Sequence, residues 1–205
     1  MKELKFIHIT KCAGTFIENI GKSNNYYWGQ WHQEYGWWHE AFVDKPEWLK
    51  KKYDWFMIVR NPYSRMISEY YCKWAGVGKN EWFDRGFYGH DKKEEFNKFL
   101  VKQIKNRNNF NIQSRERGHY IEQYKYLDKN YNINIIKFEN FNVDLKNLFK
   151  KYNIKINIDD YNKMNTRQEH NDKILYTVED LNSEAIELIN DVYDKDFKTF
   201  GYEKM

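Results

Sequence analysis

Residues 4–15 read Leu-Lys-Phe-Ile-His-Ile-Thr-Lys-Cys-Ala-Gly-Thr, and this stretch decides the fold class. Residues 4–9 form a mostly apolar run, which predicts a short buried strand. A loop is predicted over residues 10–14, followed by a helix from about Thr15 to Ile20. A strand that leads through a loop of small residues into a helix is typical of an α/β protein with a parallel sheet.

Two more buried strands are predicted, at residues 54–59 (Asp-Trp-Phe-Met-Ile-Val) and 133–138 (Ile-Asn-Ile-Ile-Lys-Phe). Pro62 is a good first residue for a helix, and one is predicted from there to about Trp74. Further helices are predicted over 46–52 with Asp44 as cap, 93–105, about 119–128, 144–152, and after a capping box from Thr177 to Asp180. Strands alternating with helices again indicate an α/β fold.

The composition limits the classes of function. The 205 residues are 41% hydrophobic and 19% aromatic, which is enough for a folded core. The net charge of +4 allows an anionic ligand, and no basic run is long enough to predict a nucleic-acid partner. The two cysteines, Cys12 and Cys72, have no zinc-site spacing. We see no leader and no membrane-length apolar stretch, so we expect a cytoplasmic protein without a membrane partner.

The loop after the first strand predicts a phosphate cradle. Small residues at 13 and 14 let backbone N–H groups approach an anion, and the helix that follows adds its positive end. Lys11 brings a full charge and Thr15 a hydroxyl donor. The alternative is an ordinary strand-to-helix turn with a surface lysine. The order differs from a nucleoside-triphosphate loop, G-x-x-x-x-G-K-[ST], because the lysine here precedes the glycine.

A second anion site is predicted at the end of the second strand. Arg60 follows that strand directly, and Ser68 lies eight residues on, in the predicted helix. A planar guanidinium and a hydroxyl group suit one phosphate held from two sides. The alternative is a surface arginine with a serine that faces solvent. Two anion sites on neighbouring strands favour a ligand with two phosphates.

The two segments together resemble the sulfotransferases that use 3′-phosphoadenosine 5′-phosphosulfate (PAPS). The closer branch contains carbohydrate sulfotransferases such as heparan sulfate 2-O-sulfotransferase. Its first pattern, F-I-H-I-P-K-x-G-G-T-S, is matched by Phe-Ile-His-Ile-Thr-Lys-Cys-Ala-Gly-Thr-Phe at residues 6–16. Its second, V-R-N-P-x-x-R-x-x-S-x-Y, is matched at every fixed position by residues 59–70.

The resemblance continues along the chain. Residues 137–141 (Lys-Phe-Glu-Asn-Phe) are similar to the family's f-E-N-l, and residues 164–167 (Met-Asn-Thr-Arg) to a late l-N-x-[SK] loop. Residues 196–202 resemble the usual ending, D-x-x-x-F-G-Y. The resemblance implies a P-loop NTPase-like three-layer fold, with a central parallel β-sheet flanked by helices. It also implies a single sulfotransferase domain over residues 1–205.

The same resemblance implies roles for the first loop. Thr10 stands where the family has proline, and Phe16 where it has a residue with a hydroxyl group. Lys11, Gly14 and Thr15 are implied to bind the 5′-phosphosulfate end of PAPS. Cys12, Ala13 and Phe16 are further implied cofactor-binding residues. Lys11 is also implied to stabilise the charge that develops on the bridging oxygen during transfer.

The resemblance further implies a 3′-phosphate site made by Arg60 and Ser68. A late loop with Asn165, Thr166 and Arg167 would close over the nucleotide, with Arg167 near the 3′-phosphate. No metal is implied, and the product would be adenosine 3′,5′-bisphosphate.

A general base is needed near the acceptor hydroxyl, and histidine suits this role. Relatives carry K-H-x-[ST]-x shortly before the second strand, and His39 within Trp-His-Glu-Ala-Phe at 38–42 holds that position. His39 is therefore favoured as the base over His32. The alternative is a structural or surface histidine. His8, within the first strand, is interpreted as structural.

The segment 26–38 is rich in aromatic residues and could stack on a sugar while nearby polar groups orient its hydroxyls. The alternative is a second small core under a long loop. Candidate acceptor-binding residues are Trp28, Trp31, His32, Trp37 and Trp38.

These observations predict transfer of a sulfuryl group from PAPS to a hydroxyl of an acceptor, with a carbohydrate or other small molecule as the partner. Two other classes stay open. A P-loop kinase of small molecules would need magnesium and a nucleoside triphosphate, and the spelling of the loop speaks against it. A glycan- or nucleotide-binding module on the same scaffold would need no histidine beside the phosphosulfate.

Overall fold

The structure is a computed structural model, and it describes residues 2–28, 39–71, 92–107, 118–161 and 176–205. Contacts between residues divide the chain into two compact units. The first comprises Met1–Arg60 with Lys125–Gln168, and the second comprises Asn61–Tyr124 with Glu169–Met205. The prediction of one domain over residues 1–205 stays a prediction.

The first unit contains the sheet. Within the described residues it has three strands, β1 (Leu4–Ile7), β2 (Asp54–Val59) and β3 (Ile133–Lys137), in the order β1-β2-β3. Both neighbouring pairs are parallel, and Val59 is aligned with Lys137 at the end of β2 and β3. The predicted α/β class with a parallel sheet is confirmed. The first and third strands end one or two residues earlier than predicted.

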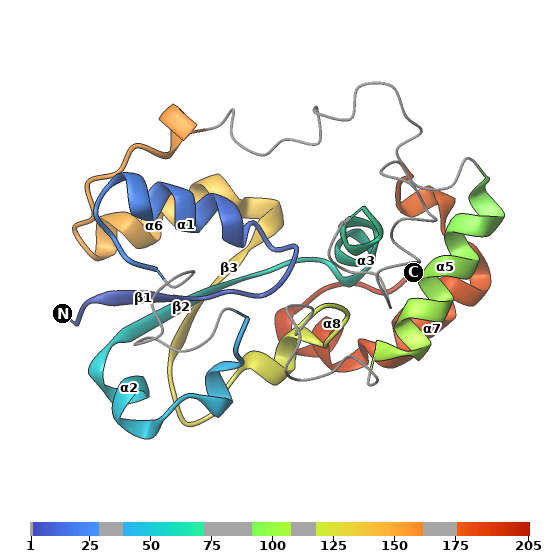
Figure 1. Ribbon diagram of the computed structural model, residues 1–205, viewed down its shortest axis with the longest axis horizontal. Coiled ribbons are helices and arrows are strands. Elements are labelled where there is room, and N and C mark those ends of the chain that lie inside the picture. The colour runs from blue at the N-terminus through green and yellow to red at the C-terminus, as the bar shows by residue number, and fades with distance from the viewer. Residues whose placement is uncertain (1, 29–38, 72–91, 108–117, 162–175) are drawn as a thin grey trace. The chain divides into compact units, whose positions relative to one another are not determined.

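Helices flank this sheet (Figure 1). Helices α1 (Gly14–Ser23) and α6 (Phe141–Lys151) lie side by side on one face, and α2 (Glu47–Lys52) lies on the other side. Strand β2 is buried along Trp55–Val59, which explains why its sequence is continuously apolar rather than alternating. Short 3-10 helices complete the connections: η2 (Phe42–Asp44), η5 (Phe138–Asn140) and η6 (Ile158–Tyr161).

Trp28 belongs to the core of the first unit, which corrects its prediction as an acceptor-binding residue. Its side chain is 3% exposed, and its ring packs on Phe56 and Phe149. The indole Nε1 donates to the Leu4 carbonyl at 3.1 Å. A Cβ at Gly21 would lie 2.7 Å from the indole, so a glycine there lets Trp28 pack against α1. Trp28 is thus part of the core around the sheet itself, rather than of a separate small core under the loop.

The second unit is built from helices: α3 (Pro62–Tyr70), α5 (Lys93–Lys105), α7 (Ser183–Val192) and α8 (Asp194–Phe200). Helix α5 has the predicted bounds. Pro62 opens α3 as predicted, and the Asn61 side chain accepts from the Tyr63 amide at 3.0 Å. Among the described residues, no helix is both long enough and apolar enough to cross a membrane.

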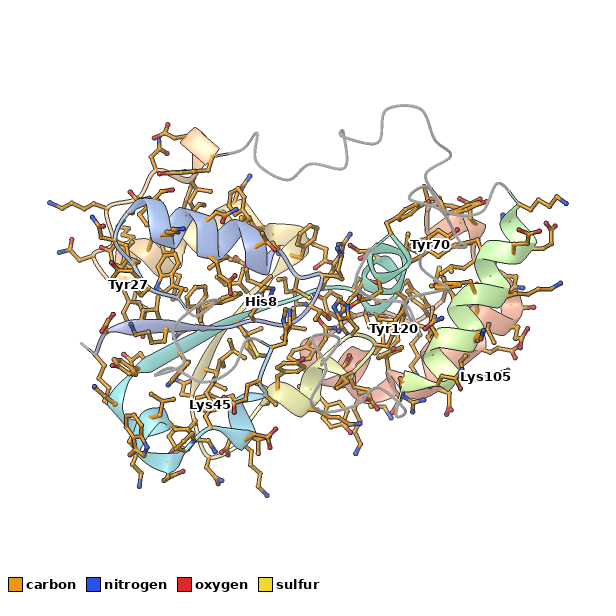
Figure 2. All side chains as sticks on the ribbon, in the orientation of Figure 1. His8, Tyr27, Lys45, Tyr70, Lys105 and Tyr120 are labelled. Carbon is orange, nitrogen blue, oxygen red and sulfur yellow. The ribbon has the colours of Figure 1, made fainter. Side chains whose placement is uncertain are left out.

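One core runs through the second unit. Its aromatic centre contains Tyr70, stacked edge-on against Phe96, and the fully buried Tyr120 (Figure 2). Arg65 is also fully buried, and its guanidinium donates to the carbonyls of Ile121 at 2.7 Å and Gly118 at 3.3 Å. A buried charge needs such partners. This second arginine of the 59–70 motif therefore holds a backbone segment of the helical unit.

The predicted helix at about 119–128 is wrong; the structure has only the 3-10 helix η4 (Gln123–Tyr126) in that range. The reason lies in the second unit. The Asp196 carboxylate accepts from the backbone amides of Gln123 at 2.9 Å and Tyr124 at 2.8 Å. Tyr120 adopts a left-handed conformation with φ 61°. In a helix, these amides would donate to helix carbonyls and each residue would have a negative φ. The two observations therefore exclude a helix over this range.

Two helix starts also differ from the predictions. The capping box of Thr177 and Asp180 is present, but it caps the start of the 3-10 helix η8 (Val178–Asp180) rather than the start of α7. Helix α7 has its own cap, because the Asn182 side chain accepts from the Ala185 amide at 2.9 Å. Helix α2 begins after Pro46, and the predicted cap Asp44 instead ends η2.

Candidate active site

Three predicted motifs meet at the carboxyl edge of the sheet, inside the first unit. His8 begins the loop after β1, Arg60 follows β2, and Phe138 follows β3. Because the strands are parallel and adjacent, their carboxyl ends share one edge, where ligands of open α/β sheets bind. Figure 2 marks His8 in this unit. All the distances in the site below join residues of the first unit.

The backbone of the loop after β1 has the geometry of an anion cradle. Lys11 has φ 59°, and Ala13 has φ 60° and ψ 17°, both in the left-handed region. A left-handed residue followed by a helical one turns successive N–H groups toward a common concavity. Ala13 is the N-cap of α1 and makes no side-chain cap bond. The N–H groups in the first turn of α1 therefore lie at this loop without a side-chain cap from Ala13, and an anion bound there would be stabilised.

Gly14 is needed for a reason that the sequence did not reveal. A Cβ at this position would lie 1.9 Å from Nε2 of His8, so only a glycine leaves room for the buried imidazole. The other ring nitrogen, Nδ1, lies 2.9 Å from Oε1 of Glu18 on α1. The His8 ring thus joins the end of β1 to two turns of α1. The His8 ring thus supports the loop after β1, and its interpretation as a structural residue stays a prediction.

His39 lies against His8. Its ring meets the His8 ring edge-on, with centroids 4.3 Å apart, and its Nδ1 is 3.2 Å from the His8 backbone oxygen. A carbonyl oxygen can only accept, so Nδ1 of His39 carries the proton of this hydrogen bond. In the neutral ring, Nε2 then holds the lone pair. This is the tautomer that a general base requires at Nε2.

Arg60 links two of the three strand ends. Its guanidinium donates to the Lys11 carbonyl at 3.3 Å, and its central carbon lies 4.3 Å from the centre of the Phe138 ring. Arg60 therefore braces the loop after β1 from the end of β2. Ser68 lies on α3 in the second unit and is half-buried. Its predicted share in a phosphate site stays a prediction.

This set of features can be compared with known families. A family model described as "Sulfotransferase family" matches residues 2–203. The chain belongs to the sulfotransferase family. Comparisons with the curated proteins and with the solved structures found no match. Membership supports sulfuryl transfer to an acceptor in general terms, and the closer resemblance to the 2-O-sulfotransferase branch stays a prediction.

Other residues of this sulfotransferase's first loop differ in exposure. Thr15 is exposed, whereas the Cys12 side chain is fully buried, so Cys12 can offer a ligand only its backbone. Phe16 is half-buried, and its ring meets Phe141 of α6 edge-on at 5.4 Å. The phenylalanine that replaces the family's hydroxyl residue therefore packs one helix against another.

The charges next to His39 are paired. Glu40 follows it in the chain, and its Oε2 lies 3.0 Å from Nζ of Lys45. Burial lowers the pKa of Lys45, although Glu40 acts in the opposite direction. Nζ of Lys45 also lies 5.5 Å from the centre of the Trp55 ring. This pair therefore limits the net charge beside the predicted base.

Several predicted site residues of the sulfotransferase lie outside the described residues, and their roles stay predictions. They are Trp31, His32, Trp37 and Trp38 in the aromatic segment, and Asn165, Thr166 and Arg167 in the late loop. Within the ranges that the structure does describe, no three His, Cys, Asp or Glu side chains gather as a metal site.

Sequence reasoning missed two residues of the site. Glu18 is four residues after Gly14, and this spacing puts both on one face of α1, where Ile17 and Gly21 are also buried. This spacing is the feature of the sequence from which Glu18 could have been predicted as a neighbour of Gly14. Phe138 was seen only as part of a matching motif, and its contact with Arg60 depends on the register of β2 and β3.

Proposed function

We propose that this sulfotransferase moves a sulfuryl group from PAPS to a hydroxyl group of a carbohydrate acceptor and releases adenosine 3′,5′-bisphosphate. One observation carries the proposal. His39, in the tautomer with Nδ1 protonated, lies beside the strand end from which an anion cradle begins. The proposed cradle for an anionic donor and the proposed base for an acceptor belong to one compact unit, which supports this function.

The residues present fit the donor. The concave backbone at Ala13 and the first turn of α1 suit the 5′-phosphosulfate end, and Lys11 adds a positive charge. Arg60 would bind the 3′-phosphate, because a guanidinium offers N–H donors in a planar fork. We include Ser68 and the late loop with Arg167 in this proposal on the basis of the family pattern. The donor is a substrate that supplies the activated sulfuryl group.

The chain's own residues would have two roles during transfer. His39 would take the proton of the acceptor hydroxyl on Nε2 while the acceptor oxygen bonds to sulfur. The bond from sulfur to the bridging phosphate oxygen breaks, and its electron pair leaves with the bisphosphate. Lys11 and the loop amides would stabilise the charge on that oxygen. Much of the remaining rate enhancement would come from holding the two reactants in the right positions.

The carbohydrate acceptor rests on the family resemblance and on the aromatic segment around Trp31. Trp37, Trp38 and His32 remain proposed acceptor contacts, whereas Trp28 does not, since it is a core residue. A kinase is disfavoured, because the lysine of the loop precedes Gly14 rather than following a glycine as in a nucleoside-triphosphate loop.

The test uses the full chain with ³⁵S-labelled PAPS and a panel of oligosaccharides, phenols and buffer alone. We expect label to move onto at least one oligosaccharide without added metal, and adenosine 3′,5′-bisphosphate to inhibit. Thermal shifts with adenosine 3′,5′-bisphosphate and with ATP–magnesium provide a second measurement. Stabilisation by ATP–magnesium alone would favour a kinase and overturn the proposal. Transfer onto phenols only would overturn the carbohydrate acceptor.

A further inference from the structure

The motif Lys-Phe-Glu-Asn-Phe at residues 137–141 has no role in the function proposed so far, yet both of its aromatic rings touch predicted cofactor residues. Phe138 lies under Arg60, with 4.3 Å between the guanidinium carbon and the ring centre. Phe141 lies edge-on to Phe16 at 5.4 Å. The two phenylalanines are half-buried and belong to the same short motif, but they support different parts of the predicted cofactor site.

The sheet register explains why Phe138 and Arg60 meet. Val59 and Lys137 are aligned across the parallel pair β2 and β3, so the next residues, Arg60 and Phe138, leave the sheet side by side. Lys137 is still extended, with φ −83° and ψ 131°, and Phe138 then begins the 3-10 helix η5 beside the end of β2. Contact therefore follows from the backbone, and any aromatic residue at position 138 would lie near the guanidinium.

The contact places the arginine without occupying its donors. An arginine side chain loses rotamer freedom when it is fixed, so an unsupported one binds a phosphate less tightly. The face of an aromatic ring attracts the cation through its quadrupole. Because the ring accepts no conventional hydrogen bond, this contact uses none of the five N–H donors of the guanidinium. One of them already reaches the Lys11 carbonyl at 3.3 Å.

We infer that Phe138 is a positioning residue that sets the nucleotide selectivity of the enzyme, by holding Arg60 where it reads the 3′-phosphate. The inference rests on the proposed function, in which Arg60 binds that phosphate. The motif at 137–141 thereby gains a role, because Phe138 orients the residue that separates a nucleoside bisphosphate from a monophosphate. Phe141 holds α6 against Phe16 of α1, the helix that follows the predicted phosphate loop, which both nucleotides would use.

The experiment measures one ratio by calorimetry on the full chain, namely the Kd of 5′-AMP divided by the Kd of adenosine 3′,5′-bisphosphate. Hydrogen bonds from a charged donor predict a wild-type ratio between about 10 and about 100. Phe138→Leu should lower this ratio by between about threefold and about thirtyfold, the range of a cation–π contact. Phe138→Tyr keeps an aromatic face and should keep the ratio within about twofold.

Phe141→Leu is the matched control, since it changes the same residue type in the same motif. It should weaken both nucleotides alike and leave the ratio unchanged, because both ligands share the 5′-phosphate. A merely structural loss at Phe138 would behave in the same way, so the ratio separates positioning from stability. Phe138→Met provides a second non-aromatic variant, unbranched and similar in volume to leucine, and it should lower the ratio like Phe138→Leu.

The double variant tests whether Phe138 acts through Arg60. Arg60→Ala alone should bring the ratio close to one, and adding Phe138→Leu should change it no further. A further fall would show that Phe138 contacts the nucleotide itself and would overturn the inference. A high wild-type ratio that survives Phe138→Leu and Phe138→Met would also overturn it and leave the proposed function standing. A wild-type ratio near one would overturn the proposed 3′-phosphate site, and the inference with it.

Discussion

Each of the two units contains a buried histidine paired with a glutamate, and the two pairs have different surroundings. In the sheet unit, His8 Nδ1 lies 2.9 Å from Glu18, with the start of α1 and His39 as neighbours. In the helical unit, His119 Nδ1 lies 2.6 Å from Glu69, which also lies 3.6 Å from Arg65.

The comparison shows that the pair itself does not reveal a site. Both pairs satisfy buried polar groups, as any buried ionisable side chain requires. Around Arg65 the remaining partners are backbone carbonyls of a helical core, so that pair belongs to the scaffold. Around His8 the neighbours are Gly14, at the start of α1, and the ring of a second histidine, His39.

The largest effect on the free energy of unfolding is expected from Arg65→Ala. Removing one partner of a buried ion pair leaves the others uncompensated, so the free energy of unfolding should fall by about 3–5 kcal/mol. Urea denaturation followed by circular dichroism measures it. Arg60→Ala is the matched control at a half-buried site and should cost less than about 2 kcal/mol. Equal costs for the two arginines would remove the distinction between scaffold and site.

His39→Ala should lower the rate of sulfuryl transfer by roughly 10²–10⁴-fold, the range for loss of a general base. Its Kd for adenosine 3′,5′-bisphosphate should stay within about threefold of wild type, because His39 contacts the strand end rather than the loop amides. His119→Ala is the comparison in the other unit. It should weaken folding and leave turnover per folded molecule unchanged. A His39→Ala protein that folds and turns over normally would make His32 the next candidate.

Glu18→Gln and Glu69→Gln compare the two pairs directly. Each should reduce the free energy of unfolding by about 1–3 kcal/mol, with Glu69→Gln the more costly because Arg65 also loses a charge partner. Only Glu18→Gln should weaken binding of adenosine 3′,5′-bisphosphate, by roughly three- to tenfold, since His8 then holds α1 less firmly. Calorimetry measures the Kd of adenosine 3′,5′-bisphosphate for both variants. An equal loss of affinity would contradict the assignment of His8 to the site.

The smallest effect is expected from Ala13→Gly, with the opposite sign. A residue with a Cβ is strained at φ 60°, and relief of that strain should stabilise the protein by up to about 1 kcal/mol. Tyr120→Gly relieves a similar φ of 61° in the helical unit but removes a fully buried ring, so it should destabilise. Thermal unfolding of both variants measures the contrast, and destabilisation by Ala13→Gly would show that the left-handed turn is not strained.

Local patterns were enough for much of the fold. The strand at 54–59, the helix at 93–105 and the proline-led helix from residue 62 were predicted from apolar runs, helical spacing and Pro62. The pattern at 119–128 failed because Asp196, more than seventy residues away in sequence, binds the amides of Gln123 and Tyr124. Trp28 failed as an acceptor residue because aromatic content does not distinguish an exposed ring from a buried one.

By itself, the sequence determined the order of strands and helices, the loop with Lys11 and Gly14, and the motifs that place the chain among sulfotransferases. These features are local, since period, turn residues and motif spacing depend on neighbours in the chain. Only the tertiary structure decided that the His8 ring fills the space above Gly14, that His39 Nδ1 donates to the end of β1, and that Phe138 supports Arg60. Those contacts join distant residues, and they exist because adjacent parallel strands bring their carboxyl ends to one edge.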